Sequence, residues 1–192
     1  MYVRDAKNRE EVWLLDRIEE MGLDETAFRS RDYVIAIDET DNEKAGFGRI
    51  RVHKTDDGEI CELTSIGVLD AWRGQGVGAH VIERLVQKAG DQGFETVYSL
   101  TDEHEYLAQF GFEGVDPDTL PERLRERLAE KRENIQPDAV PMRLTVADFE
   151  MPRARRDAFK AATSEDEGEP QESAEDFGID PDEATYKYDT DD

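Results

Sequence analysis

The sequence "ELTSIGVLDAWRGQGVGAHVIERLV" at residues 62–86 decides the fold, because it changes from a strand pattern to a helix pattern across a glycine-rich turn. The segment "TSIGV" is typical of a strand, and apolar residues between positions 77 and 89 recur at helical spacing. Between them Gly74, Gly76 and Gly78 occupy alternate positions. Glycines at the start of a helix allow backbone N–H groups to approach an anion closely. The stretch therefore predicts a strand, an anion-binding turn and a helix in direct succession.

Two common nucleotide-binding loops do not fit this turn. A dinucleotide-binding loop has the spacing G-x-G-x-x-G inside a parallel strand–helix unit, whereas the spacing here is G-x-G-x-G and follows a predicted meander. A phosphate-binding P-loop requires a lysine directly after its last glycine, and Gly78 is followed by Ala79. A strand-to-helix turn that binds no ligand stays open as the simplest alternative.

The rest of the pattern predicts one mixed α/β domain. We expect strands at 1–6, 32–38, 44–54, 60–70, 95–100, 112–115 and 139–146, and helices at 8–22, 76–90, 102–111 and from about 121 onward. Polar turn clusters join the second, third and fourth strands, so these strands form a meander. Two helices are expected to bury an apolar stripe, formed by Val12, Leu15 and Ile18 in the first and by Leu120, Leu124 and Leu128 in the last.

The composition is strongly acidic, with 48 Asp and Glu against 24 Lys and Arg and a net charge of −24 over 192 residues. This charge argues against a nucleic-acid backbone or an anionic membrane as a partner. The acids are spread over the whole chain, and arginine is preferred to lysine, as in a cytoplasmic protein of a halophile. An ordinary acidic protein with an acidic tail is the alternative.

The single cysteine, Cys61, excludes a disulfide framework and a thiolate metal site, and the three histidines lack metal-ligand spacing, so we expect no metal. No apolar run is long enough to span a membrane, and no signal-peptide pattern is present, which favours a cytoplasmic location. We expect a folded domain at 1–149, a basic linker or marginal helix at 150–163, and a disordered acidic tail at 164–192.

The segment "RGQGVGA" after the strand "SIGV" resembles the coenzyme loop of the GNAT family of acetyl-CoA-dependent N-acetyltransferases, whose form is Q/R-x-x-G-x-G/A. The resemblance covers about residues 1–149. It implies the GNAT fold, a mixed and mostly antiparallel sheet flanked by helices. It also implies that backbone N–H groups at the start of the helix bind the pyrophosphate of acetyl-CoA, with the glycines keeping side chains clear.

The resemblance implies a set of coenzyme-binding residues. The end of the strand pairs with the pantetheine arm, and a backbone N–H at or near Val68 stabilises the oxyanion as the amine attacks. The coenzyme-binding residues expected on this basis are Ile66, Gly67, Val68, Arg73, Gly74, Gln75, Gly76, Val77, Gly78 and Ala79.

The catalytic residues are less completely matched. Family members often carry a tyrosine that protonates the departing thiolate, and in "EYLAQFGF" Leu107 stands at that position. Tyr106 is the candidate acid, but a one-residue step on a helix turns a side chain by about 100°, which predicts that Tyr106 faces elsewhere as a core or surface aromatic. Glu62 is the candidate base, acting through water, unless it simply faces solvent. His80 is expected to pack behind the loop, and His104 is an alternative acid.

The stretch from Leu100 to Asn134 further resembles the end of the GNAT domain in amino-acid acetyltransferases of the N-acetylglutamate synthase kind. This resemblance implies a small amino acid or amine as the acceptor, ahead of a protein N-terminus, a lysine side chain or an antibiotic. A non-catalytic acyl-CoA-binding module is the alternative from a different functional class. A homodimer stays a candidate, since no feature of the sequence decides the oligomeric state.

Overall fold

A computed structural model describes residues 1–164 of the chain. In chain order the elements are β1 (Tyr2–Asp5), α1 (Glu11–Glu20), β2 (Tyr33–Ile37), β3 (Lys44–Thr55), β4 (Gly58–Val68), α2 (Val77–Asp91), β5 (Thr96–Thr101), α3 (His104–Ala108), β6 (Glu113–Gly114), α4 (Glu122–Asn134), β7 (Val140–Thr145) and α5 (Arg153–Lys160). All the predicted strands and helices of the domain are present. Apart from Ser164, the predicted acidic tail at 164–192 lies outside the described residues.

The strands form a seven-stranded sheet in the order β1-β2-β3-β4-β5-β7-β6. Neighbouring strands are antiparallel except β4 and β5, which run parallel and are joined through α2. The strands β2, β3 and β4 form the predicted meander. The predicted mixed and mostly antiparallel α/β architecture is therefore confirmed.

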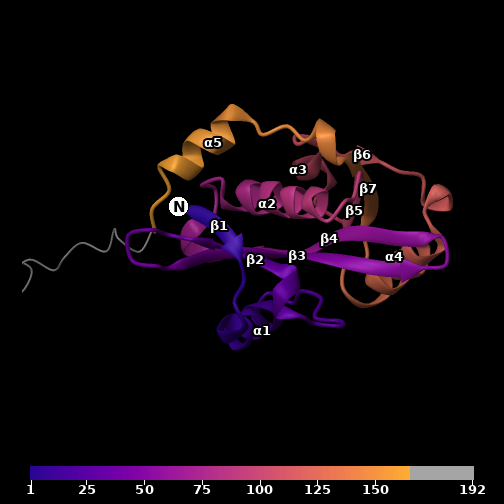
Figure 1. Cartoon of the computed structure of the whole chain (residues 1–192), viewed down its shortest axis with the longest axis horizontal. Coiled ribbons are helices and arrows are strands. Elements are labelled where there is room, and N and C mark those ends of the chain that lie inside the picture. Colours follow the sequence, from indigo (N-terminus) through magenta and orange to yellow (C-terminus); the bar gives the residue numbers. More distant parts are fainter. Residues whose placement is uncertain (165–192) are drawn as a thin grey trace, which may run out of the picture.

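Helices cover both faces of this sheet, with α2 along one face, α5 beyond it, and α1 on the opposite face (Figure 1). Every residue of β2, from Tyr33 to Ile37, is buried because neighbouring helices close both of its faces. Alternate residues of β2 pack toward the cluster around α2 and the cluster around α1. The two cores hold the sheet rigidly between α1 and α2.

The predicted apolar stripe of α1 is wrong at Val12 and at Leu15, which is only partly buried. Leu14 and Ile18 are fully buried against Tyr33, Ile35 and Phe47, whereas the side chain of Val12 is 70% exposed. Helical spacing allows either stripe, and the packing against β2 and β3 selects the one through Leu14. In α4, Leu124 and Leu128 pack with Leu120 as predicted.

The sheet opens between β4 and β5. Their parallel pairing consists of Glu62 opposite Tyr98, and beyond this point the C-terminal halves of both strands continue without further pairing. Ser65 in β4 has a φ of 51°, and the register with β3 shifts at the same place. Such a bulge bends a strand and redirects its edge. The sheet thus contains a gap at its centre with one edge of β4 exposed to it.

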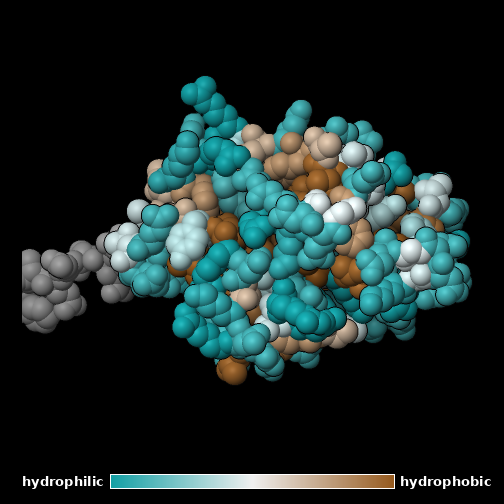
Figure 2. All heavy atoms as spheres, viewed as in Figure 1, coloured by the Kyte–Doolittle hydropathy of each residue, from teal (hydrophilic) through white to brown (hydrophobic). Residues whose placement is uncertain are grey.

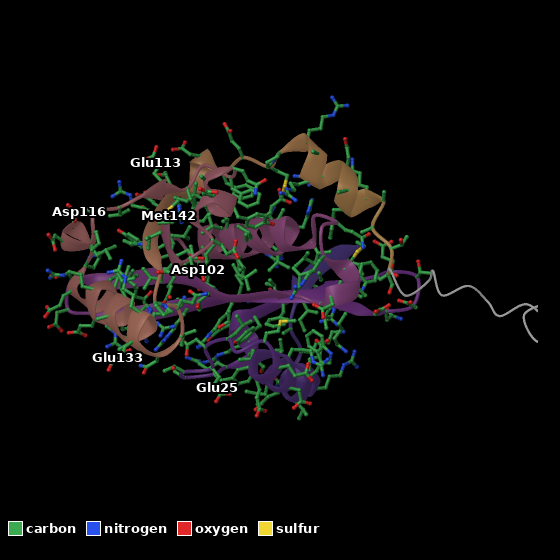
Figure 3. The ribbon with its side chains drawn as sticks, turned by 180° about the vertical axis from the view of Figure 1, so that it is seen from behind. Glu25, Asp102, Glu113, Asp116, Glu133 and Met142 are labelled. Atoms are coloured by element: carbon green, nitrogen blue, oxygen red, sulfur yellow. The ribbon has the colours of Figure 1, made fainter. Side chains whose placement is uncertain are left out.

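Acidic side chains are distributed over the folded part of the chain as well. Most of the face in Figure 2 is hydrophilic. The view from behind in Figure 3 labels five acidic side chains from separate parts of the fold, Glu25, Asp102, Glu113, Asp116 and Glu133, and each of them is exposed. The acidic composition is therefore a property of the domain surface and not only of the last residues.

Candidate functional site

A cavity of about 1200 Å³ lies in the gap between β4 and β5. At one end it reaches the glycine loop, residues 73–78, and at the other it reaches Lys131 of α4 and Gln136, which follows that helix. Residues of α1 and of α3 line its sides. One continuous cavity therefore connects the predicted anion-binding turn with the opened edge of β4 and with a buried cation.

The glycine loop has a fixed backbone between β4 and α2. Trp72 before it is fully buried, and its Nε1 donates to Glu43 Oε1 at 3.2 Å. Gly74 and Gly76 have φ angles of +72° and +76°, which L side chains rarely adopt. These turns bring the chain directly into α2, whose first N–H groups have no partners within the helix. The loop end of the cavity is therefore suited to an anion.

Most of the predicted coenzyme-binding residues line this cavity, and two do not. The cavity-lining members are Ile66, Gly67, Val68, Arg73, Gly74, Gly76, Val77 and Gly78. Ala79 is fully buried in the core beneath the loop. The side chain of Gln75 turns away to exchange two hydrogen bonds, of 2.7 and 2.8 Å, with the backbone of Thr163. Arg73 is largely exposed and pairs with Asp70 at 3.1 Å.

The space beside Gly76 is taken by another part of the chain. A Cβ on Gly76 would overlap the carbonyl oxygen of Arg155 in α5 and would lie 3.3 Å from the backbone N of Phe159. A Cβ on Gly74, in contrast, would meet nothing within 4 Å. The close approach at Gly76 is therefore an approach of helix α5, whereas Gly74 leaves open space for a ligand.

Tyr106 lines the cavity, although the sequence predicts that it faces elsewhere, and it also packs on the core as predicted, with its ring centroid 5.3 Å from that of Phe110. Its hydroxyl would lie 3.1 Å from a Cβ on Gly78, next to Val68, and its ring lines the cavity. Leu107, one residue on, is buried in the core. Burial raises the pKa of the Tyr106 hydroxyl above its usual value of 10.0, an effect that the nearby Arg155 partly opposes. Tyr106 therefore keeps its proton at neutral pH and can donate it.

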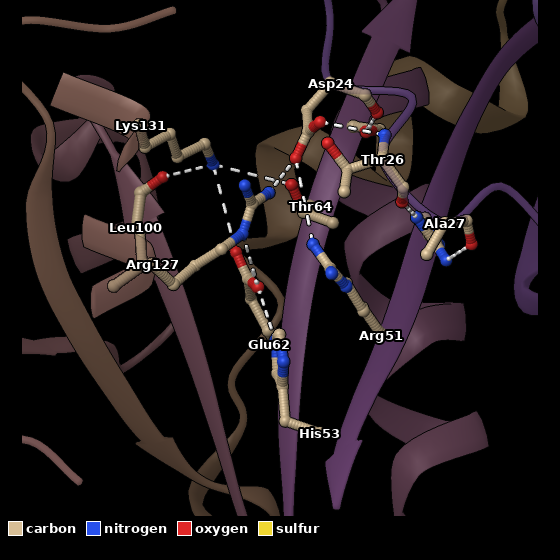
Figure 4. A network of polar contacts seen from close by, with 12 residues as sticks. Asp24, Thr26, Ala27, Arg51, His53, Glu62, Thr64, Leu100, Arg127 and Lys131 are labelled. Carbon is tan, nitrogen blue, oxygen red and sulfur yellow. Dashed lines mark hydrogen bonds and ion pairs between the residues drawn. The ribbon is translucent and has the colours of Figure 1, made fainter. Parts of the chain in front are cut away.

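Glu62 is completely buried, so the alternative that it faces solvent is wrong. Its Oε1 lies 2.9 Å from His53 Nε2 and 3.4 Å from Arg127 Nε (Figure 4). Its Oε2 has no hydrogen-bond partner among the described residues and lies 4.0 Å from Lys131 Nζ. Glu62 does not itself line the cavity, so any exchange of a proton with a bound molecule passes through a neighbour.

Lys131 is the neighbour that reaches the cavity. Its Nζ donates to the Leu100 carbonyl oxygen at 2.6 Å and to Thr64 Oγ1 at 3.4 Å. Burial lowers the pKa of Lys131 to about 8, although the charge of Glu62 opposes this shift. The ammonium form still predominates at pH 7, which places a positive charge at the α4 end of the cavity.

Sequence reasoning missed the buried charges of Asp24, Arg127, Lys131 and the cavity-facing Arg155. Asp24 pairs with Arg127, and burial lowers the pKa of this arginine. The signal that could have found the α4 pair is its spacing, because Arg127 and Lys131 are four residues apart on the same side as Leu124. Asp24 and Arg155 lie in segments without such a pattern.

The histidines do not form a site of their own. His80 Nδ1 lies 2.8 Å from the Gly76 carbonyl oxygen, and its ring stacks on Phe159 with centroids 3.9 Å apart. Burial lowers its pKa, which favours the neutral packing role that the sequence suggests. His104 is exposed at the start of α3. Within residues 1–164 no group of three or more His, Cys, Asp and Glu side chains is arranged to hold a metal ion.

A membrane-crossing helix would need a long apolar stretch, and no helix in the part of the chain that the structure describes meets this requirement.

Comparison with protein families gives a match of residues 2–112 to the model of the acetyltransferase (GNAT) family. The amino-acid acetyltransferase of Mycobacterium tuberculosis is 35% identical over 71 residues, which make up 37% of this chain and 39% of that protein. The match thus spans well under two thirds of the relative's length.

Two solved structures share the fold. N-acetylglutamate synthase from Neisseria gonorrhoeae, solved with coenzyme A and N-acetyl-glutamate, has a TM-score of 0.61 and 19% identity over 75% of this chain and 34% of that chain. Rv2747 from Mycobacterium tuberculosis, solved with coenzyme A, has a TM-score of 0.62 and 18% identity over 76% of this chain and 99% of that chain. At these identities the likeness is one of fold.

Proposed function

Since the family match covers more than half of the chain, the chain belongs to the GNAT acetyltransferase family, and we propose that it transfers an acetyl group from acetyl-CoA to the primary amine of a small amino acid or another small amine. The observation that carries this proposal is the continuous cavity from the glycine loop through the β4–β5 gap to Lys131. It offers an anion-binding end, an exposed strand edge and a cationic end in one line.

The loop end suits the pyrophosphate of acetyl-CoA. The first turn of α2 supplies N–H groups and the positive end of the helix dipole, and Gly74 and Gly78 carry no side chains that would obstruct an approach. The edge of β4 at residues 66–68 that faces away from β3 can pair with the amides of the pantetheine arm. In this arrangement the thioester lies between β4 and β5, with a β4 backbone N–H near Val68 available to its carbonyl oxygen.

The α4 end of the cavity suits the carboxylate of an amino acid. The Lys131 ammonium has three donors, and Leu100 and Thr64 use two of them. The third can bind an acceptor carboxylate, a charge-assisted contact in a buried setting. The similarity to an amino-acid acetyltransferase supports the same class of acceptor. An amine without a carboxylate would lack this contact.

We propose Tyr106 as the acid and Glu62 as the base of the reaction. The acceptor ammonium loses one proton, and the neutral nitrogen then forms a bond to the acetyl carbon. The C–S bond breaks, and the thiolate takes a proton from the Tyr106 hydroxyl. The new amide nitrogen gives up its second proton, which restores the Tyr106 hydroxyl. The first proton from the acceptor reaches the uncommitted Oε2 of Glu62 through water beside Lys131. Both substrates are bound at once, so no acetylated protein intermediate forms.

The acidic surface supports a further proposal about the protein's surroundings. We propose that the protein works in the cytoplasm of a cell with concentrated salt, where carboxylates keep a protein surface hydrated. Activity that is retained or raised in molar potassium chloride is the expected result. A homodimer stays a proposal, which light scattering of the purified chain tests.

The decisive experiment is a thiol-release assay with acetyl-CoA across amino acids, other small amines and peptide N-termini, run at high salt. We expect release with at least one amino acid and none without acceptor. The matched control is the α-amide of the same amino acid, which keeps the amine and removes the carboxylate charge and should have a higher KM. Coenzyme A binding without release by any acceptor would leave the non-catalytic acyl-CoA-binding module in place of an enzyme. Release with peptides alone would favour a protein acceptor.

A further inference from the structure

Helix α5 is anchored on the coenzyme loop, although it lies outside the residues that the family model matches. Arg156 pairs with Glu83 of α2 through contacts of 2.7 and 3.4 Å. Phe159 stacks on His80, with the ring planes 8° apart. Figure 1 shows α5 on the outer side of α2, opposite the sheet. The predicted marginal segment at 150–163 thus includes a helix with specific contacts.

The anchoring extends into the glycine loop itself. The Arg155 carbonyl touches Gly76, and the backbone of Thr163 exchanges two hydrogen bonds with the side chain of Gln75. Gln75 is one of the predicted coenzyme-binding residues, and here it serves to hold the segment after α5. The loop and α5 therefore form one rigid unit at this end of the cavity.

Arg155 differs from the other arginines of α5 in how its charge is used. Arg153 pairs with Asp157 at 3.8 Å and Arg156 pairs with Glu83, whereas no carboxylate of residues 1–164 lies within 4.0 Å of the Arg155 guanidinium. In a chain with twice as many acidic as basic residues, a cation without a carboxylate is unexpected. An unpaired cation at a cavity is a typical feature of an anion site.

The position of Arg155 is also fixed. Its Nε donates to Gln109 Oε1 at 3.1 Å, and its guanidinium lies 5.4 Å from the centre of the Tyr106 ring. The side chain lines the same cavity as Gly74, Gly76 and Gly78. A guanidinium has five N–H donors, of which Nε supplies one. The remaining four are available at the end of the cavity where the anion is expected.

We infer that α5 forms a wall of the coenzyme site and that Arg155 binds the pyrophosphate of the coenzyme together with the glycine loop. This inference rests on the proposed function, because it takes coenzyme A as the ligand of the cavity. Arg155 then adds positive charge to that of the loop, and it does so from α5, which lies beyond the residues 2–112 that the family model matches. The domain would then need residues up to 163 for full coenzyme affinity.

The test is calorimetric titration of the full chain with coenzyme A, dephospho-coenzyme A and pantetheine. The variant Arg155→Met keeps the apolar stem over Tyr106 and removes the charge. The matched control is Arg153→Met in the same helix, whose side chain is 95% exposed. We expect Arg155→Met to weaken binding of both phosphate-containing ligands by roughly 10- to 100-fold, as for a lost charge-assisted contact, and to leave pantetheine unaffected. The control should bind all three ligands as the unmodified chain does.

Three results would overturn the inference, and they differ from a failure of the proposed function. Equal coenzyme A affinity in the two variants would remove Arg155 from the site. A loss seen with coenzyme A but not with dephospho-coenzyme A would assign Arg155 to the 3′-phosphate instead of the pyrophosphate. Hydrogen exchange over residues 153–163 reports whether α5 stays docked, and a loss explained by undocking alone would also contradict a direct role. If the unmodified chain binds no coenzyme A, the proposed function falls first.

Discussion

Replacing Gly76 by alanine tests the unit formed by the loop and α5, with Gly74→Ala as a closely matched control. The two glycines have nearly the same φ, +76° and +72°, so both substitutions carry the same left-handed strain of roughly 1–2 kcal/mol. Their surroundings differ, because a Cβ at position 74 meets nothing within 4 Å and a Cβ at position 76 meets the backbone of α5. The difference between the two variants therefore isolates the contact with α5.

The size of this difference follows from what α5 must give up. A Cβ on Gly76 overlaps the Arg155 carbonyl oxygen, so α5 has to move outward by roughly 1 Å to restore an ordinary contact. That movement disrupts the stacking of Phe159 on His80. Burial of a phenylalanine contributes about 1.5–3 kcal/mol. We expect Gly74→Ala to cost roughly 1–2 kcal/mol and Gly76→Ala to cost roughly 3–5 kcal/mol.

Thermal unfolding and hydrogen exchange measure these effects together. For a chain of this size each kcal/mol corresponds to about 2–4 °C in Tm, so the two variants should be separated by several degrees. Exchange at residues 153–163 should accelerate in Gly76→Ala and stay unchanged in Gly74→Ala. Equal losses of Tm, with equal protection of α5 in both variants, would refute the reasoning.

Three other substitutions test the proposed acid, the proposed base and the buried lysine. Tyr106→Phe should lower kcat by roughly 10²- to 10⁴-fold with little change in coenzyme A affinity, because it removes a donor and keeps the ring; an unchanged kcat would rule Tyr106 out as the acid. Glu62→Gln removes the carboxylate charge beside the buried Lys131 and one of the two carboxylates beside Arg127, which keeps Asp24, so urea unfolding should show a loss of about 3 kcal/mol. An unchanged free energy of unfolding would mean that the cluster adds little stability. Burial lowers the pKa of Lys131 to about 8 from its usual 10.5, so between these values the unfolded chain binds more protons and the stability of the unmodified chain rises with pH. Between pH 8 and pH 10 the free energy of unfolding of the unmodified chain should rise relative to that of Lys131→Met. A difference between the two chains that stays constant over this range would contradict a lowered pKa of Lys131.

Local patterns were sufficient to predict the elements around the loop. The helix expected at 76–90 is observed as Val77–Asp91, and the last strand expected at 139–146 is observed as Val140–Thr145. Both have strong apolar periodicity and glycine or polar residues at their ends, which specify type and position locally. The same holds for the placement of most predicted coenzyme-binding residues along one cavity, because they come from the end of one strand and the turn that soon follows it.

Contacts between distant segments could not be predicted in this way. The direction of Tyr106 depends on how the five-residue helix α3 sits against Gly78 and Val68, and counting along a family pattern gave the opposite answer. The buried face of α1 is predicted through Val12, but packing on β2 and Phe47 selects the face through Leu14. Arg155 lies about 80 residues after the loop that it contacts, and nothing in its own segment indicates this partner. In each case tertiary packing decides between arrangements that the local sequence allows equally.

Acetyl transfer to a small amino acid is tested most directly by mass spectrometry of the products formed from acetyl-CoA with a carbon-13-labelled acetyl group. The purified chain is incubated at high salt with this coenzyme and a mixture of free amino acids. The account predicts one or a few amino acids that carry the labelled acetyl group on their amine nitrogen, formed in amounts that match the thiol released. Coenzyme that binds to the chain while every amino acid stays unlabelled would contradict it.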